Sequence, residues 1–297
     1  MIRMTDLTFE LADGRMLGYA LYGPETGQKV FYLHGTPSSR LEPQLLNIWG
    51  KRLAQLLQQY NLQLIAVDRP GMGLSSFDND RSYTSVAADA LALLQHLGVQ
   101  SCPVLCWSGG GPYALTLAQQ FPQVVTTVCI IAGISSSFGN EDVYAHMGWN
   151  KLYFNTARQA PMLLQGTFEA IKRTTLSTPP SQSLYDLSNV DYALVKDVDS
   201  INQLLELTIK EALHTDNKGA VQEAQLYFEP LPYTLSEIRV PVHFWWGTED
   251  NVVTYIHAKN MERQLPHVTP HYKAGEGHLS IYVNYFEEVL QVLRTAF

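Results

Sequence analysis

A serine between small residues, at the point where an apolar run meets a helical pattern, constrains this chain most. The apolar run 103–105 is followed by Cys-Trp-Ser-Gly-Gly at residues 106–110. This pattern is typical of a nucleophile elbow, a sharp strand-to-helix turn that lifts the serine hydroxyl clear of a sheet. The turn requires small residues two places to either side of the serine, and here these are Cys106 and Gly110. The segment therefore predicts a strand–turn–helix unit with Ser108 at its tip.

Two later strand ends supply the base and the acid that an activated serine needs. An apolar strand over residues 240–246 ends in a Gly-x-x-Asp turn at Asp250, and a short strand from His271 leads into a glycine-flanked loop with His278. The order Ser, Asp, His is that of triads built around a nucleophile elbow. Open α/β sheets gather their sites at the carboxyl ends of strands. We therefore predict Ser108 as nucleophile, His278 as base and Asp250 as the orienting acid.

The alternatives to this triad are a neighbouring carboxylate, a thiol and the other histidines. Glu249 is the rival acid, although the glycine spacing favours Asp250. Cys106 is interpreted as a packing residue beneath the turn rather than a nucleophile. Five other histidines are interpreted as structural or solvated: His96, His243, His257, His267 and His271.

An oxyanion hole is predicted where another strand runs into a glycine turn. Residues 30–36 read Val-Phe-Tyr-Leu-His-Gly-Thr. We expect the backbone amides of Thr36 and Gly109 to stabilise an oxyanion beside the serine. The residues expected to support the two turns are His34, Gly35 and Gly110.

These motifs resemble those of the α/β-hydrolase superfamily. His-Gly-Thr-Pro at residues 34–37 is similar to its oxyanion-loop signature, and Asp-Arg-Pro-Gly-Met-Gly-Leu-Ser at 68–75 to the loop after its fourth strand. The resemblance extends from about residue 8 to the C-terminus and is greatest to the branch of esterases and proline iminopeptidases. Cys106 replaces the first elbow glycine, and the second glycine of the His-Gly-Gly-Pro-Gly segment of proline iminopeptidases is missing. The resemblance implies a mostly parallel eight-stranded sheet flanked by helices, with an inserted helical cap.

The order of the predicted elements is that of a doubly wound α/β sheet. Strands are predicted at residues 7–11, 16–22, 29–34, 62–67, 104–107 and 125–132, before the two strands named above. The first two form an antiparallel pair around an Asp-Gly turn. Helical periodicity is present at residues 49–60, 86–97, 109–121 and 279–293.

The pattern changes between the sixth and seventh predicted strands, where helical signals dominate. Helices are predicted at residues 149–173, 200–213 and 218–228. We expect an α/β-hydrolase core of residues 1–133 and 238–297 and a helical cap, or lid, of residues 134–237. The acids of this region are interpreted as solvated helix residues rather than as an amine-binding site: Glu141, Asp142, Asp191 and Glu206.

The predicted triad and the resemblance together imply hydrolysis through an acyl-enzyme. We expect a small, largely apolar carboxylic ester or lactone as substrate. Most aromatic and methionine residues of the cap are interpreted as packing it against the sheet, with the lining of an apolar pocket as the alternative role for several of them. Alternatives with the same triad are an aminopeptidase of the proline-iminopeptidase type, a carbon–carbon bond hydrolase, a hydroxynitrile lyase and a small-molecule receptor with slow turnover. Only the shape of the pocket distinguishes among them.

Composition and motif searches exclude several other classes. A net charge of −8 without a basic cluster argues against nucleic acid as a partner, and the longest apolar runs fall far short of the ~20 residues of a membrane span. No Cys/His cluster has metal-ligand spacing, and the Gly109–Gly111 run lacks a phosphate-loop lysine, so no cofactor or metal is expected. Three cysteines and the absence of a signal-peptide pattern favour a reducing, cytoplasmic location. The expected partner is a small-molecule substrate; monomer and homodimer both remain open.

Overall fold

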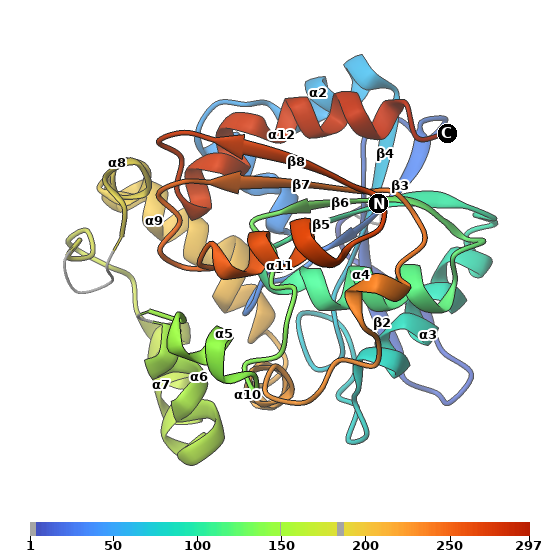
Figure 1. The fold of residues 1–297 in the computed structure, drawn as a ribbon. Coiled ribbons are helices and arrows are strands. Elements are labelled where there is room, and N and C mark those ends of the chain that lie inside the picture. The colour runs from blue at the N-terminus through green and yellow to red at the C-terminus, as the bar shows by residue number, and fades with distance from the viewer. Residues whose placement is uncertain (1–3, 149, 183–186) are drawn as a thin grey trace.

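Eight strands form one sheet at the centre of the computed structural model, which describes residues 4–148, 150–182 and 187–297 (Figure 1). The strands are β1 (Leu7–Glu10), β2 (Met16–Tyr22), β3 (Gln28–Leu33), β4 (Leu62–Val67), β5 (Cys102–Trp107), β6 (Val125–Ile131), β7 (Val242–Gly247) and β8 (Val268–Lys273). Their order in the sheet is β1-β2-β4-β3-β5-β6-β7-β8. Only β2 pairs antiparallel with its neighbours β1 and β4, and the other pairs are parallel. The predicted mostly parallel, eight-stranded sheet is confirmed.

Helices cover both faces of this sheet (Figure 1). One face carries α1 (Leu45–Ile48), α2 (Leu53–Tyr60) and α12 (His278–Arg294). The other face carries α3 (Tyr83–His96), α4 (Gly111–Gln120) and α11 (Ile256–Gln264). The central strands are therefore buried on both sides, which explains their nearly continuous apolar sequences.

The period of two along each strand divides the core between the two faces. In β3, Val30 and Tyr32 pack with the α2 and α12 side, whereas Phe31 and Leu33 pack with the α3 and α4 side. All six residues of β4 and of β5 are buried. This rigid centre supports the turns at the carboxyl ends of the strands.

The chain between β6 and β7 is helical. It forms α5 (Glu141–Ala145), α6 (Asn150–Gln159), α7 (Pro161–Arg173), α8 (Asn189–Val195), α9 (Val198–Leu205) and α10 (Lys218–Leu226). A π-helical turn follows α9 at Glu206–Lys210. Short 3-10 turns elsewhere are Glu42–Gln44, Ser108–Gly110 and Leu235–Glu237. Figure 1 shows α6 to α9 on the side of the molecule toward which the arrowheads of β7 and β8 point.

Two predicted helices have different bounds in the structure. The helix predicted at 49–60 begins only at Leu53, because Gly50 (φ +74°) and Arg52 (φ +49°) turn the backbone out of the right-handed helical region. The helix predicted at 149–173 is divided at Pro161, whose ring disfavours helical backbone at the residue before it. Its predicted first residue, Trp149, lies outside the described residues.

The sequence patterns do not predict α1, α5 and α8, which are too short for a clear periodicity. By contrast, α3 forms where it was predicted. The side chain of Ser82 accepts a hydrogen bond from the Ser85 amide at its start, and Gly98 (φ +70°) follows its end. None of the helices in the described ranges is both long and apolar enough to cross a membrane.

Candidate active site

Ser108 lies at the tip of a strained turn between β5 and α4. Its φ of +52° is rare for a residue with a side chain. A Cβ atom on Gly110 would meet the Leu33 carbonyl oxygen and would lie 3.0 Å from Cys106 Cβ, so the turn requires glycine there. Cys106 is buried in the core beneath the turn, and burial raises its pKa well above the ordinary value, in line with its interpretation as a packing residue.

The structure brings the predicted serine, histidine and aspartate together at three strand ends. His278 Nε2 lies 3.0 Å from Ser108 Oγ, and His278 Nδ1 lies 2.9 Å from Asp250 Oδ2. The other oxygen of Asp250 accepts hydrogen bonds of 2.9 Å from the amides of Val252 and Val253. These bonds orient the carboxylate toward the imidazole.

The rival acid Glu249 is exposed, and its backbone amide donates to the carbonyl of Glu276. Asp250 is buried and is the carboxylate that contacts the imidazole. The difference follows from the tight turn after β7, in which the Asp250 amide donates to the Gly247 carbonyl.

Opposing effects act on His278. Burial lowers its pKa, but the negative charge of Asp250 and the hydrogen bond to it, with a smaller contribution from Asp191, outweigh burial and raise the pKa above its ordinary value. The ring also stacks on Trp107, with 5.2 Å between centroids. With Nδ1 donating to Asp250, Nε2 is left to accept the serine proton.

Asp191 is buried, which corrects the prediction of a solvated helix residue. Its side chain is 2% exposed and accepts three hydrogen bonds of 2.7–3.0 Å from the amides of His278, Leu279 and Ser280. These are the orphan donors at the start of α12, so Asp191 caps that helix from α8. No local signal identifies such a cap, because Asp191 precedes His278 by 87 residues. The other three acids of that group are exposed, as expected: Glu141, Asp142 and Glu206.

The predicted oxyanion residues lie beside the serine turn. A Cβ atom built on Gly109 would lie 2.6 Å from the methyl group of Thr36, so the two backbones approach closely. Within the described part of the chain, the Thr36 amide donates no hydrogen bond to another residue. His34 is buried and neutral, since burial holds its pKa well below the ordinary value. It donates from Nδ1 to the Gly35 carbonyl (2.7 Å) and accepts at Nε2 from the Arg69 amide (3.3 Å).

A buried ion cluster lies behind this loop, and no sequence pattern predicts it. Glu223 of α10 pairs with Arg69 and Arg81, and all three side chains are fully buried. Glu223 also accepts a hydrogen bond from the Thr36 hydroxyl, while Arg69 donates to the Gly35 carbonyl at 2.7 Å. Burial raises the pKa of Glu223, but the two arginines outweigh it and lower the pKa to about 2. The carboxylate is therefore charged at neutral pH.

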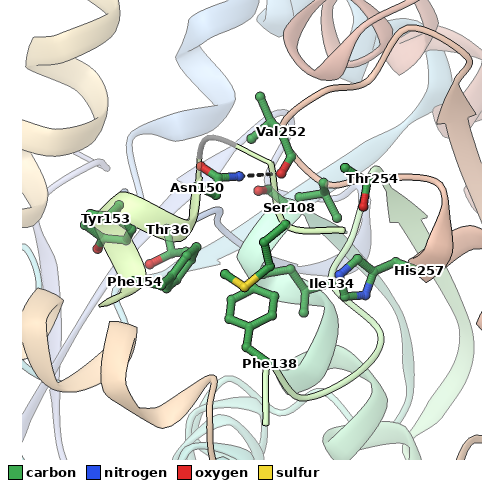
Figure 2. Close-up of a pocket in the computed structure, with 12 residues that line it drawn as sticks. Thr36, Ser108, Ile134, Phe138, Asn150, Tyr153, Phe154, Val252, Thr254 and His257 are labelled. Atoms are coloured by element: carbon green, nitrogen blue, oxygen red, sulfur yellow. Dashed lines mark hydrogen bonds between the residues drawn. The ribbon is translucent and has the colours of Figure 1, made fainter. Parts of the chain in front are cut away.

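A small cavity of about 50 Å³ adjoins Ser108 and Thr36 (Figure 2). Its other lining residues come mainly from the helical segment and the loop after β7: Ile134, Phe138, Met147, Asn150, Tyr153, Phe154, Val252, Val253, Thr254 and His257. Figure 2 shows the hydrogen bond from the Asn150 amide group to the Val252 carbonyl across one side of it.

His257 was interpreted as structural or solvated, and the structure buries it at the wall of this cavity. Its Nδ1 accepts a hydrogen bond of 3.1 Å from the Ser135 amide. Burial lowers its pKa to about 3, so the ring is neutral in the physiological range. The sequence carried no signal for this position because His257 lies in α11, away from any motif.

A larger cavity of about 490 Å³ lies beside the imidazole. Trp107, His278 and Leu279 form its inner wall, and α7, α8 and α9 supply mostly apolar side chains. Val252 lines both cavities. Among the residues that the structure describes, no group of three or more His, Cys, Asp or Glu is placed to hold a metal ion.

Comparison with known proteins identifies the family of this chain. A family model described as the alpha/beta hydrolase fold matches residues 30–285. The chain is 27% identical to the uncharacterized hydrolase YcgS of Bacillus subtilis over 136 residues, 46% of this chain and 43% of that protein. It is 28% identical to an sn-1-specific diacylglycerol lipase of Xenopus laevis over 123 residues, 41% of this chain and 35% of that protein. The chain thus spans less than half the length of these curated relatives.

Similar solved structures cover nearly the whole chain. An esterase from Exiguobacterium antarcticum has a TM-score of 0.67 at 18% identity, covering 98% of both chains. A meta-cleavage product hydrolase from Pseudomonas fluorescens has a TM-score of 0.69 at 16% identity, covering 99% of this chain and 98% of that one. At such identities the likeness establishes the fold alone. Because the family model spans most of its length, the chain belongs to the α/β hydrolase fold family.

Proposed function

We propose that this protein is a serine hydrolase that cleaves a small, largely apolar carboxylic ester or lactone through an acyl-enzyme. The observation that carries the proposal is the continuous chain of contacts from Ser108 Oγ through the imidazole of His278 to Asp250, at 3.0 and 2.9 Å. These are hydrogen-bond distances at which a base can take the serine proton.

The proposed reaction has two halves. Ser108 Oγ attacks the carbonyl carbon while His278 Nε2 takes its proton, and Asp250 stabilises the imidazolium. The amides of Thr36 and Gly109 stabilise the tetrahedral anion, a contribution of about 10²–10³ in rate per donor in other enzymes. The carbon–oxygen bond to the leaving group then breaks, and His278 protonates the departing alcohol. Water repeats the sequence on the acyl-enzyme and releases the acid and free Ser108.

The buried carboxylates favour a neutral substrate over the amine of an aminopeptidase substrate. Recognition of an N-terminal amine needs a carboxylate available near the serine. Glu223 is already paired with two arginines, and both oxygens of Asp191 accept backbone amides. Both of these buried carboxylates therefore already have partners within the protein and are not available to bind a substrate amine. An ester, which brings no charge to be neutralised, fits these surroundings better.

We also propose that residues 134–237 act as a cap over a core of residues 1–133 and 238–297. Phe138 and Phe154 of this segment line the small cavity beside Ser108, and Ile171 and Ile201 line the larger one. Both cavities thus have walls from the segment and from the strand ends. Such a cover excludes water during acyl transfer.

The test compares hydrolysis of p-nitrophenyl esters by the wild type, Ser108→Ala and Ser236→Ala. We expect multiple turnovers by the wild type, unchanged rates for Ser236→Ala, and a loss in kcat on the order of 10⁶ for Ser108→Ala, as for the nucleophile of another serine hydrolase. Ser236 is an exposed serine far along the chain and controls for the substitution itself. A fluorophosphonate should label the wild type at Ser108, as detected by peptide mass spectrometry. Ester hydrolysis that survives in Ser108→Ala contradicts the nucleophile assignment, and an inert wild type contradicts the esterase proposal.

A further inference from the structure

Two cavities adjoin the Ser108–His278 pair, one lined by Ser108 and the other by His278, and they differ about tenfold in volume. The cavity at Ser108 and Thr36 has about 50 Å³, and the cavity at His278 and Trp107 has about 490 Å³. One water molecule needs about 10–15 Å³ of such volume. The small cavity therefore has room for only a few non-hydrogen atoms, whereas the large one accepts a branched or ring-containing group.

The chemistry of the proposed reaction determines which part of an ester enters which cavity. In the tetrahedral intermediate the carbonyl oxygen faces the amides of Thr36 and Gly109. The leaving oxygen must receive its proton from His278 Nε2, so the alcohol portion lies on the histidine side. The acyl substituent is then left with the space on the Ser108 and Thr36 side. The larger cavity, whose wall includes His278 itself, therefore receives the alcohol.

The lining of the large cavity indicates the chemical class of that alcohol. Its walls are mainly aliphatic side chains: Ile171, Leu176, Val195, Ile201, Leu205 and Leu279. Asp191 is the one carboxylate among the described residues of the wall, and it is occupied by the amides at the start of α12. An apolar group gains free energy by leaving water for such a site, whereas a charged or sugar-like group loses its hydrogen bonds to water.

We infer that the preferred substrates are short-chain acyl esters, such as acetates, of bulky apolar alcohols. The alcohol occupies the 490 Å³ cavity beside His278, and the acyl group occupies the 50 Å³ cavity beside Ser108. This inference rests on the proposed esterase function and adds an orientation and a substrate class to it.

The test uses two isomeric esters, hexyl acetate and ethyl hexanoate, with ethyl acetate as reference. The isomers have the same atoms and similar hydrophobicity, and they differ only in which side of the ester carries the chain. We expect kcat/KM for hexyl acetate to exceed that for ethyl hexanoate by about tenfold or more. The kcat/KM for hexyl acetate should also exceed that for ethyl acetate, because each methylene added to the alcohol can raise kcat/KM by up to about fourfold.

Two variants assign the preference to the cavities. Ile171→Trp fills part of the large cavity and should lower the hexyl acetate to ethyl acetate ratio by about tenfold. Leu163→Trp, on the same helix but 65% exposed, is the matched control and should keep the wild-type ratio. Met147→Ala enlarges the small cavity and should raise kcat/KM for ethyl hexanoate relative to hexyl acetate.

The possible failures are distinguishable. Hydrolysis of both isomers with equal rates, or with ethyl hexanoate preferred, overturns the orientation and leaves the esterase proposal standing. A preference for hexyl acetate that Ile171→Trp does not change overturns the assignment to this cavity. Failure to hydrolyse any of the three esters overturns the proposed function and the orientation with it.

Discussion

Two carboxylates hold His278 through different atoms. Asp250 bonds to the ring nitrogen Nδ1, and Asp191 accepts the backbone amide of the same residue at 2.7 Å. Both charges raise the pKa of the imidazole against the effect of burial. At the scale of the residue, the geometry of the proposed base and its protonation are thus controlled together.

The raised pKa of His278 predicts the acid limb of the pH profile. A protonated imidazole cannot accept the serine proton, so kcat/KM should fall as pH decreases through a pKa above the ordinary value of 6.5. Asp250→Asn removes the largest opposing charge and should move this limb to lower pH, while reducing kcat about 10⁴-fold. The residual rate is measurable with an activated p-nitrophenyl ester. An acid limb at the same pH in both proteins contradicts the role assigned to Asp250.

At the scale of the element, Asp191 connects two helices. Its side chain extends from α8 and accepts hydrogen bonds from the first backbone amides of α12. The start of α12 coincides with the proposed base, so the cap that satisfies the helix also places the histidine. This explains why a short helix distant in sequence contributes to the site.

Asp191→Asn should weaken this cap and disturb the histidine. The amide offers one acceptor oxygen where the carboxylate offered two, and the charge at the helix start is lost. We expect about 1–2 kcal/mol less free energy of unfolding in urea titrations. We also expect a lower kcat with little change in KM, and an acid limb shifted to lower pH. Asp199→Asn, at an exposed position in the first turn of α9, is the matched control. A loss of stability without a shift of the acid limb assigns Asp191 a purely structural role.

At the scale of the whole molecule, Glu223 joins the helical segment to the loops after β3 and β4. Its carboxylate contacts Arg69, Arg81 and the hydroxyl of Thr36, and every one of these contacts is distant in sequence. A fully buried ion cluster is left with an uncompensated charge when one member is lost. The loop that carries Thr36 and the helix α10 therefore depend on each other for their positions.

Glu223→Gln should reduce the free energy of unfolding by about 3–5 kcal/mol at neutral pH, because two buried arginines lose their counter-charge. The pKa of Glu223 is lowered from 4.5 to about 2 in the folded protein. Its contribution is therefore fully present above the unfolded value and is lost as pH falls from about 4.5 toward 2. The difference between wild type and variant should shrink over that range in urea titrations. The exposed Glu229→Gln is the control, and a difference that is constant with pH contradicts the ion-pair account.

The sequence by itself determined the features that depend on local backbone and periodicity. The turn around Ser108 was readable because a positive φ and a crowded backbone demand small neighbours at fixed positions. The order and type of the strands followed from apolar runs and from turns between them, and the positions of Asp250 and His278 from strand ends that must share one edge of a parallel sheet. These constraints act over a few residues, so they leave a pattern in the sequence.

Only the tertiary structure decided how distant segments complete the site. Glu223 lies 187 residues from Thr36 and 154 from Arg69, and Asp191 lies 87 from His278. Neither acid has a distinctive local pattern, because its partners are backbone amides or side chains that reach it only after the chain folds. The sizes of the two cavities likewise depend on how α7, α8 and α9 pack beside the strand ends. Packing between segments depends on the sum of many weak contacts between distant residues, and no local sequence motif corresponds to any one of these contacts.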